Sequence, residues 1–231
     1  MAGEQSVTTL DVFERLAEGG RFGQAEEQGG NYYADDPVER RNLEAFIVQT
    51  ATQHIFTTPT RPQLRFLVSG CGDGLETEIL ADRGFDVTAY DYSPNMVAAT
   101  RRRLNEAGLT ARLVVTDAVA PDLGNCRQFT GVMFAQVAQF LTDDQIPTAI
   151  ANAAALARRV LYIATTQYDD PTHRRRWVLD GEDCGETIYH GRPADTYIGL
   201  MTDNGFVVVH RDHFDAGPGD YKNDYLIGVR R

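Results

Sequence analysis

Cysteine is scarce in this sequence, and long hydrophobic runs are absent. The three cysteines among its 231 residues, Cys71, Cys126 and Cys184, stand more than fifty positions apart. This odd, wide spacing provides no CxxC pair, zinc ribbon or disulfide ladder, so we expect a reducing compartment and no metal site. Nowhere do about 18 consecutive apolar residues occur, and the N-terminus lacks a basic region followed by an apolar run. We therefore expect a cytoplasmic protein.

Positive charge is also in short supply. The 22 Lys and Arg residues against 33 Asp and Glu give a formal net charge of −11, and Lys222 is the only lysine. Such a charge repels phosphate backbones and anionic lipid surfaces over about a Debye length. We expect no nucleic-acid or membrane partner, a small-molecule substrate, and a monomer or homodimer.

What is present is a rhythm of short β-rich runs alternating with helical runs. With 42% hydrophobic residues, the chain is long enough to bury a sizeable core as one large α/β domain or two small ones. The alternation predicts a parallel sheet with helices on both faces. Strands are expected at 64–69, 86–91, 111–116, 131–135 and 160–165, and helices at 75–83, 94–107 and 143–157.

The segments on either side of this rhythm have a different character. Residues 1–62 are expected to form an N-terminal helical cap, with helices at 9–18 and 37–56, before a core domain at 63–231. Residues 167–192 are expected to form an irregular insertion, or a hairpin, that covers the active site. A helix at 194–204 and strands at 207–211 and 225–229 complete the predicted elements.

The sharpest local signal is the glycine-rich turn Gly70-Cys71-Gly72-Asp73-Gly74, which follows one expected strand and precedes a helix. Glycines allow a backbone to approach a ligand closely, and a helix N-terminus offers unpaired N–H groups. The spacing is GxGxG, which differs from the GxGxxG of NAD and FAD enzymes, and no GK[ST] follows.

Asp91 ends the next expected strand, 21 positions after Gly70. An acidic side chain at this place can accept both ribose hydroxyls of a nucleoside, although it can also belong to an ordinary turn capped by Ser93 and Pro94. Together with the glycine turn, it favours a nucleoside-containing ligand.

These residues resemble the class I S-adenosylmethionine-dependent methyltransferases over about residues 64–165. The resemblance implies a Rossmann-like, mostly parallel seven-stranded sheet with the last strand antiparallel. It also implies S-adenosylmethionine as cofactor and S-adenosylhomocysteine as product. By the same resemblance, the cofactor contacts are Gly70, Cys71 and Gly72 at the methionine and ribose, Asp91 at the ribose, Tyr92 and Met96 at the adenine, Asp117 and Ala118 at the adenine N6, and Ala135 and Gln136 at the methionine moiety and the methyl group.

One position departs from the family's pattern. The family commonly has an acidic residue two positions before the first glycine, where it supports the turn and, through it, the amino group of the cofactor. This chain has Val68 there, followed by Ser69. The departure leaves open a noncatalytic protein that binds the cofactor. An NAD(P)-dependent reductase is the other alternative, which the glycine spacing disfavours.

Methyl transfer to a hydroxyl, phenol or amide is helped by a general base, whereas an amine or thiolate needs none. The candidates in the insertion are His173, His190 and Tyr168, with solvated loop residues as the ordinary alternative.

Tyr33 follows glycines in the cap and resembles the family's aromatic lid, or it packs against the sheet. We expect methylation of N or O in a bacterial natural product or metabolite, an analogy from fold and size.

Three clusters receive ordinary interpretations. His210 and His213 are three apart on an expected strand, so their side chains point to opposite faces and cannot share a metal ion. The run at 101–103 is expected to be a solvated helix face. The arginines at 174–176 either meet an anionic substrate or pair with acidic residues near 180–183.

Overall fold

The computed structural model describes residues 8–18, 37–57, 64–125, 128–179, 182–215 and 221–231. Seven strands form one sheet in the order β3-β2-β1-β4-β5-β9-β8, and two more form a separate hairpin. The strands of the sheet are β1 (Arg65–Ser69), β2 (Asp86–Asp91), β3 (Arg112–Val115), β4 (Phe129–Ala135), β5 (Ala157–Tyr168), β8 (Phe206–Asp215) and β9 (Tyr221–Arg230); the hairpin is β6 (Thr172–Leu179) and β7 (Glu182–His190). The helices are α1 (Thr9–Glu18), α2 (Pro37–Thr57), α3 (Leu75–Asp82), α4 (Pro94–Glu106), α5 (Ile146–Leu156), α6 (Ala194–Asp203) and the short 3-10 helix η2 (Ala138–Phe140).

The strand directions follow the predicted pattern. The first five strands pair in parallel, and β9 runs antiparallel to both β5 and β8. The predicted mostly parallel sheet with an antiparallel last strand is therefore confirmed. The carboxyl ends of β1, β2 and β4 meet at one edge, beside the point where the strand order reverses, which is where open α/β sheets bind ligands.

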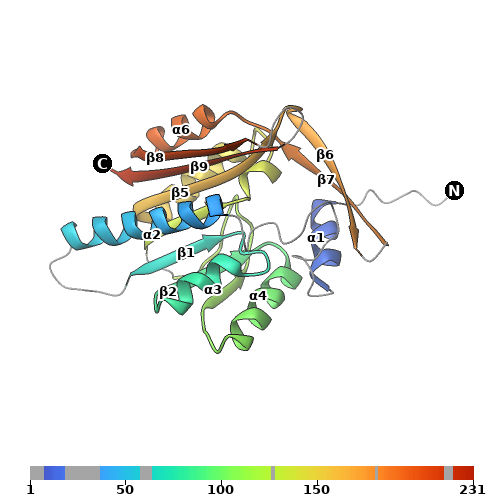
Figure 1. Ribbon diagram of the computed structural model, residues 1–231, viewed down its shortest axis with the longest axis horizontal. Helices are drawn as coiled ribbons and strands as arrows, with labels where there is room; N and C mark the ends of the chain where they lie inside the picture. The colour runs from blue at the N-terminus through green and yellow to red at the C-terminus, as the bar shows by residue number, and fades with distance from the viewer. Residues whose placement is uncertain (1–7, 19–36, 58–63, 126–127, 180–181, 216–220) are drawn as a thin grey trace.

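Two helical layers cover the sheet (Figure 1). Helices α2, α3 and α4 pack on one face, where Phe46, Leu80 and Leu104 meet Phe66 and Val68 from β1. Helices α5 and α6 pack on the other face around an equally apolar set. Because both faces of the parallel strands are buried, those strands are nearly continuous runs of apolar residues, as in β4, which is buried throughout.

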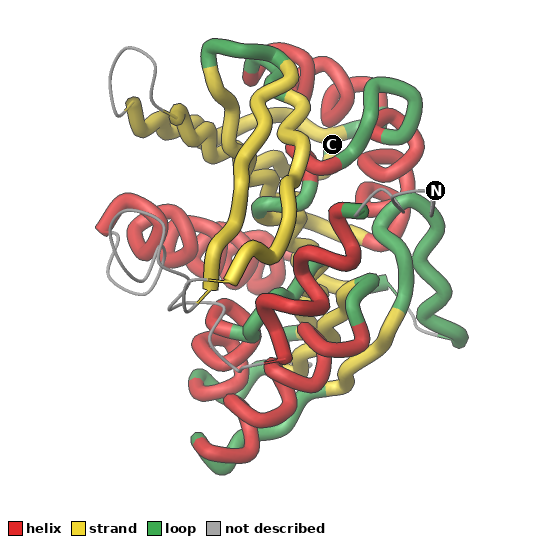
Figure 2. The backbone as a smooth tube through the Cα atoms, turned by 90° about the vertical axis from the view of Figure 1, so that its right-hand side faces the viewer, coloured by secondary structure: helices red, strands yellow, loops and turns green. Residues whose placement is uncertain are grey.

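A third, smaller cluster lies over the carboxyl edge of the sheet. Here α1 touches both α4 and the hairpin β6–β7, and its Val12 and Phe13 pack with Met96, Trp177 and Tyr189. Figure 2 shows the long hairpin and α1 on the same side of the molecule. The segment at 167–192 is thus mostly regular: β5 continues to Tyr168 and the hairpin follows, which decides between the two expectations for this segment.

The two terminal strands are longer than the patterns at 207–211 and 225–229 indicated. The reason is that β9 pairs with β5 from Val160 to Tyr168, so its register continues to Tyr221. This pairing is a contact between segments far apart in the sequence, which local alternation does not report.

Candidate functional site

The glycine turn leaves β1 at Ser69 and enters α3 at Leu75. Gly74, with φ of 95°, forms the N-cap of α3, and a Cβ there would lie 2.9 Å from the backbone Cα of Thr100. Gly72, with φ of 51°, has nothing within 4 Å of the place where its Cβ would be. Gly74 is therefore needed for helix packing, whereas Gly72 faces open space in which a ligand can approach the backbone.

Asp91 joins the turn to the end of β2. Its carboxylate accepts the Gly72 N–H at 3.0 Å and the Ser93 N–H at 3.0 Å. Burial raises the pKa of Asp91, and these backbone donors oppose the rise. The carboxylate, 6% exposed, is thus held in place by the glycine turn. The structure brings together the two features that the sequence indicated separately.

Helix α4 supports the turn from below. Thr100 Oγ1 donates to the Gly72 carbonyl at 2.8 Å, and Arg103 donates to the Asp73 carbonyl at 2.9 Å and to its carboxylate at 2.6 Å. Arg103 also pairs with Glu78 at 3.0 Å. The expectation that 101–103 forms a solvated face is therefore wrong for Arg103, because its guanidinium reaches across to α3. Sequence reasoning missed both Thr100 and Arg103.

Cys71 has a packing role in this turn. Its thiol is 2% exposed and lies 3.3 Å from Thr100 Oγ1. Burial, together with the charge of Asp91, raises the pKa of the thiol, so it stays protonated and poorly nucleophilic.

Tyr92 and Met96, the expected adenine contacts, follow Asp91 and lie under α1. Tyr92 is 37% exposed with its ring 6.4 Å from that of Phe13, and Met96 is buried. Helix α1 is fastened here because the Ser93 hydroxyl donates to the Glu14 carboxylate. Glu14 carries no motif of its own and was not predicted.

Asp117 and Ala118 lie beside Asp91, as their expected adenine contact requires. The N–H of Thr116 donates to the Asp91 carbonyl at 2.9 Å, which joins the end of β3 to the end of β2. The Asp117 side chain is exposed and accepts the N–H of Val119, so it shapes the local turn.

Ala135 and Gln136 end β4. Gln136 is the only non-glycine residue with positive φ (56°) among those that the structure describes. Its side-chain carbonyl lies 2.7 Å from Thr166 Oγ1 and accepts from Gln139 Nε2 at 2.9 Å. Its Nε2 is buried and has no hydrogen-bond partner within the described ranges. A strained backbone and a buried amide donor without a protein acceptor are typical of a position that meets a ligand.

The three candidate bases are separated by the hairpin. His173 stacks on Tyr168 with ring centroids 3.7 Å apart, and its pairing partner Tyr189 lies 6.1 Å away. His190 pairs with Thr172, one position along each strand, and so points to the opposite face of the hairpin. Burial and the nearby Arg192 lower the pKa of His190. The structure thus groups Tyr168 with His173 and leaves His190 apart.

The other residues singled out in the sequence do not lie together at the sheet edge within the described residues. Tyr33 lies outside the described residues. Of the arginine run, Arg176 pairs with Asp183 and Arg174 with Glu186. His210 contacts Asn42, whereas His213 contacts Asp224 at 3.1 Å, so these histidines do not converge.

Across the described part of the chain, no group of three His, Cys, Asp or Glu side chains is placed to hold a metal ion, and no helix is long and apolar enough to cross a membrane.

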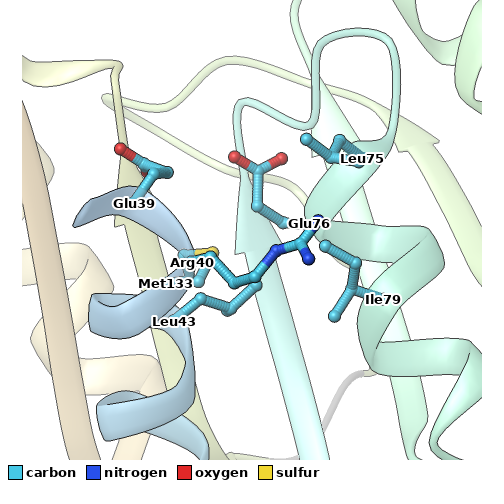
Figure 3. Close-up of a pocket in the computed structure, with 7 residues that line it drawn as sticks. All are labelled: Glu39, Arg40, Leu43, Leu75, Glu76, Ile79 and Met133. Carbon is cyan, nitrogen blue, oxygen red and sulfur yellow. The ribbon is translucent and has the colours of Figure 1, made fainter. Parts of the chain in front are cut away.

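A small pocket opens between α2, α3 and β4, next to the glycine turn (Figure 3). Its charged lining residues are Glu39, Arg40 and Glu76, and its apolar ones include Leu43, Ile79 and Met133. In Figure 3 the carboxyl groups of Glu39 and Glu76 lie on the same side of the pocket and come from facing helices. The sequence does not reveal this pocket, because its lining residues on α2 and α3 are far apart in the chain and meet only in the folded protein.

Glu76 makes the stability of the protein depend on pH. Burial first, and then the charge of Asp73, raise its pKa from 4.5 to about 7, while Arg103 opposes the rise. Because the pKa of Glu76 is higher in the folded than in the unfolded state, its contribution to the free energy of unfolding is fully present below pH 4.5. This contribution is lost as the pH rises through about 7. Between pH 5 and 8 the wild type should lose roughly 2–3 kcal/mol of unfolding free energy more than Glu76→Gln does. Urea denaturation of both proteins at both pH values measures this difference, and identical pH dependence would contradict it.

Comparisons with known proteins agree with this fold. Residues 66–159 match the model of a family described as a methyltransferase domain. Ubiquinone biosynthesis O-methyltransferase from Methylocella silvestris is 34% identical over 82 residues, which are 35% of this chain and 31% of that relative. The match therefore spans about a third of the curated relative's length.

Solved structures match over far more of the chain. Magnesium protoporphyrin IX methyltransferase (ChlM) from Synechocystis, with bound S-adenosylmethionine, has a TM-score of 0.65 at 16% identity and covers 100% of both chains. The N-methyltransferase NodS from Bradyrhizobium japonicum, in complex with S-adenosylhomocysteine, has a TM-score of 0.62 at 18% identity, over 95% of this chain and 98% of that one. A third, 1,6-didemethyltoxoflavin-N1-methyltransferase from Burkholderia thailandensis, has a TM-score of 0.53 at 17% identity and covers 83% and 80%. At these identities the likeness shows the fold.

The protein thus has the class I methyltransferase fold, and the resemblance indicated by the glycine turn and Asp91 is confirmed. Residues 66–159 are the part of the chain that is similar to the methyltransferase-domain family.

Proposed function

We propose that this protein transfers the methyl group of S-adenosylmethionine to an N or O atom of a small-molecule acceptor. The observation that carries the proposal is the buried Asp91 carboxylate, fixed by the Gly72 N–H at the edge where the strand order reverses. The matched domain model and the S-adenosylmethionine-bound relative of the same fold support the choice of cofactor.

The residues at the edge fit this cofactor. Asp91 can accept the ribose hydroxyls, and Gly72 leaves room for the backbone to approach them. The exposed face of Tyr92 can cover the adenine, and the buried amide donor of Gln136 can meet an acceptor at the methionine end. When bound, S-adenosylmethionine supplies an electrophilic methyl carbon on its sulfonium.

The protein's own contribution is mainly positioning. Helix α1 and the hairpin pack together beside the edge, where they can shield a bound ligand. Holding reactants in line can contribute about 7–11 kcal/mol in favourable cases. His173, supported by stacking on Tyr168, can accept a proton from a hydroxyl or phenol acceptor. An amine acceptor attacks in its neutral form and needs no base.

The net charge of −11 disfavours a nucleic-acid acceptor and so supports a small one. The names of three similar proteins refer to ubiquinone biosynthesis, magnesium protoporphyrin IX and 1,6-didemethyltoxoflavin, which supports an acceptor from metabolism or natural-product synthesis. Val68 in place of the family's acid supports the second candidate, a noncatalytic protein that binds the cofactor.

Calorimetric titration tests the proposal. S-adenosylmethionine and S-adenosylhomocysteine should both bind in roughly the micromolar range, and NADH should not bind. Formation of S-adenosylhomocysteine with a panel of phenol, hydroxyl and amine acceptors then separates the two candidates. Binding without turnover on any acceptor favours the noncatalytic protein, and failure of both cofactor forms to bind contradicts the proposed function.

A further inference from the structure

The side-chain amide of Gln136, at the end of β4, is hydrogen-bonded on one side only. Its carbonyl oxygen accepts from Gln139 Nε2 at 2.9 Å and from Thr166 Oγ1 at 2.7 Å, so both of its lone pairs are used. Its Nε2 is buried and has no acceptor among the residues that the structure describes. A buried amide donor without an acceptor costs free energy, and a ligand that supplies an acceptor atom removes this cost.

The neighbours of this amide set its orientation. If the amide were turned over, its NH2 group would face the NH2 group of Gln139 at 2.9 Å, and two donors repel each other. Thr166 is compatible with the present orientation, because a hydroxyl can donate to Gln136 while it accepts from the amide of Asn223, which lies 2.7 Å away. The two N–H groups of Gln136 are therefore the donors that a ligand would meet.

The amide is directed toward β5 and the hairpin. Strand β4 lies between β1, which carries the glycine turn, and β5, which leads into the hairpin. Val137, the next residue, contacts the glycine turn, since a Cβ on Gly70 would lie 2.2 Å from its Cγ2. The Gln136 amide instead bonds to Thr166 on β5 and to η2, which packs against β7. This places it between the cofactor edge and the hairpin that carries the candidate base His173.

The backbone of Gln136 fixes where the side chain points. Its φ of 56° lies in the left-handed region, where a residue with a Cβ is strained and glycine is not. Gly70, at the end of the neighbouring strand β1, has a similar φ of 67° without this strain. The chain nevertheless carries an amide side chain at the end of β4, which supports a role for the amide itself.

We propose that Gln136 Nε2 donates to an oxygen atom of the methyl acceptor, so that the enzyme selects acceptors with a carbonyl or carboxylate oxygen beside the atom that is methylated. This inference rests on the proposed function, and it names the group that the Gln136 amide meets at the methionine end of the cofactor. Such an oxygen accepts from an amide without adding a donor of its own. The amide acts in recognition, and proton transfer belongs to other groups.

The test uses two aromatic probes, because aromatic rings gather on this side of the edge. Phe140 of η2 lies 5.0 Å from Tyr189, which lies 5.2 Å from Tyr168, and flat compounds pack well against such rings. The probes are ortho-hydroxyacetophenone and ortho-ethylphenol, which differ only in that a CH2 group replaces the carbonyl. Each is titrated into protein saturated with S-adenosylhomocysteine, and ligand-observed NMR measures its affinity.

The wild type should bind the ketone at least about tenfold more tightly than the ethyl compound, which leaves the Gln136 donor without an acceptor. In Gln136→Met, which has no donor, this ratio should fall to about one. Because S-adenosylhomocysteine is saturating in every titration, the ratio does not depend on affinity for the cofactor.

Gln136→Glu separates recognition from support of the fold. Glutamate keeps the oxygen that accepts from Gln139 and Thr166 and replaces the N–H donors by a second oxygen, so the preference for the ketone should disappear or reverse. Gln128→Glu is the matched control. Its amide donates to the Ala155 carbonyl at 2.9 Å, at the opposite edge of the sheet, and the wild-type ratio should remain. Thermal unfolding confirms that the variants are folded.

The outcomes are separable from those of the proposed function. If the wild type binds S-adenosylhomocysteine but binds both probes equally, or neither, the cofactor site stands and the inference is wrong. An unchanged ratio in both Gln136 variants also overturns it, and weaker binding of S-adenosylhomocysteine in the same variants would assign the amide to the cofactor. Failure of the wild type to bind S-adenosylhomocysteine contradicts the proposed function itself, and this inference with it.

Discussion

Replacing Asp91 by alanine is expected to lower the affinity for S-adenosylhomocysteine by about a hundredfold or more. The substitution removes the acceptor for the ribose hydroxyls and, at the same time, the acceptor for the N–H groups of Gly72 and Ser93. The buried Ser93 N–H and the half-buried Gly72 N–H would then have no partner, and the glycine turn would lose its fixed position. Losses of ligand contact and of preorganisation add in the same direction, so this is the largest effect on binding that we expect.

Two further variants separate the loss of ligand contact from the loss of the fixed position of the glycine turn. Asp91→Asn keeps the side-chain shape and one carbonyl oxygen, and should give an intermediate loss of affinity. Asp86→Asn changes the exposed carboxylate at the opposite end of β2, which pairs with Arg65, and should alter affinity by less than about twofold. Calorimetry on the three variants measures this series. Wild-type affinity in Asp91→Ala would show that the glycine turn and the end of β2 are not the cofactor site.

The part of the site that was predictable from the sequence is the part that depends on neighbours along the chain. The glycines, Asp91 and Gln136 all lie where a predicted strand ends, and parallel strands bring their carboxyl ends to one edge whatever the details of packing. The strands and helices around them were also predictable, because strands that are buried on both faces consist of short runs of apolar residues, which can be recognised locally.

The supporting residues could not be predicted in this way. Arg103 and Thr100 reach the glycine turn only because α4 packs beside α3, and Glu14 reaches Ser93 only because α1 lies across α4. Nothing in the local sequence of these residues separates them from ordinary helix residues. The pocket of Glu39 and Glu76 is a further example, since its two carboxylates lie 37 positions apart in the chain.

The hairpin illustrates the same distinction for the candidate bases. His173 and His190 were equivalent in the sequence because both lie in the segment that covers the site. Strand pairing separates them: His173 stands opposite Tyr189, on the face that carries Trp177, and that face packs against α1. His190 is directed to the other face of the hairpin. The structure therefore predicts different consequences for two substitutions that the sequence could not rank.

His173→Ala is expected to lower turnover of a phenol or hydroxyl acceptor by about a hundredfold or more, without weakening S-adenosylhomocysteine binding. His190→Ala should change turnover by less than about threefold, because a base must lie within hydrogen-bond reach of the proton it accepts. Tyr168→Phe keeps the ring that stacks on His173 and removes only its hydroxyl, so it separates support by stacking from a direct role of the phenol.

The kinetic readout is the rate of S-adenosylhomocysteine formation as a function of pH, with binding of S-adenosylhomocysteine measured in parallel. Loss of the base should lower turnover at every pH without weakening binding, whereas disruption of the hairpin would weaken binding as well. Unchanged turnover in both histidine variants would exclude them as bases. The acceptor would then have to be nucleophilic by itself, which selects an amine over a phenol, because positioning along the sulfonium axis would be sufficient for transfer.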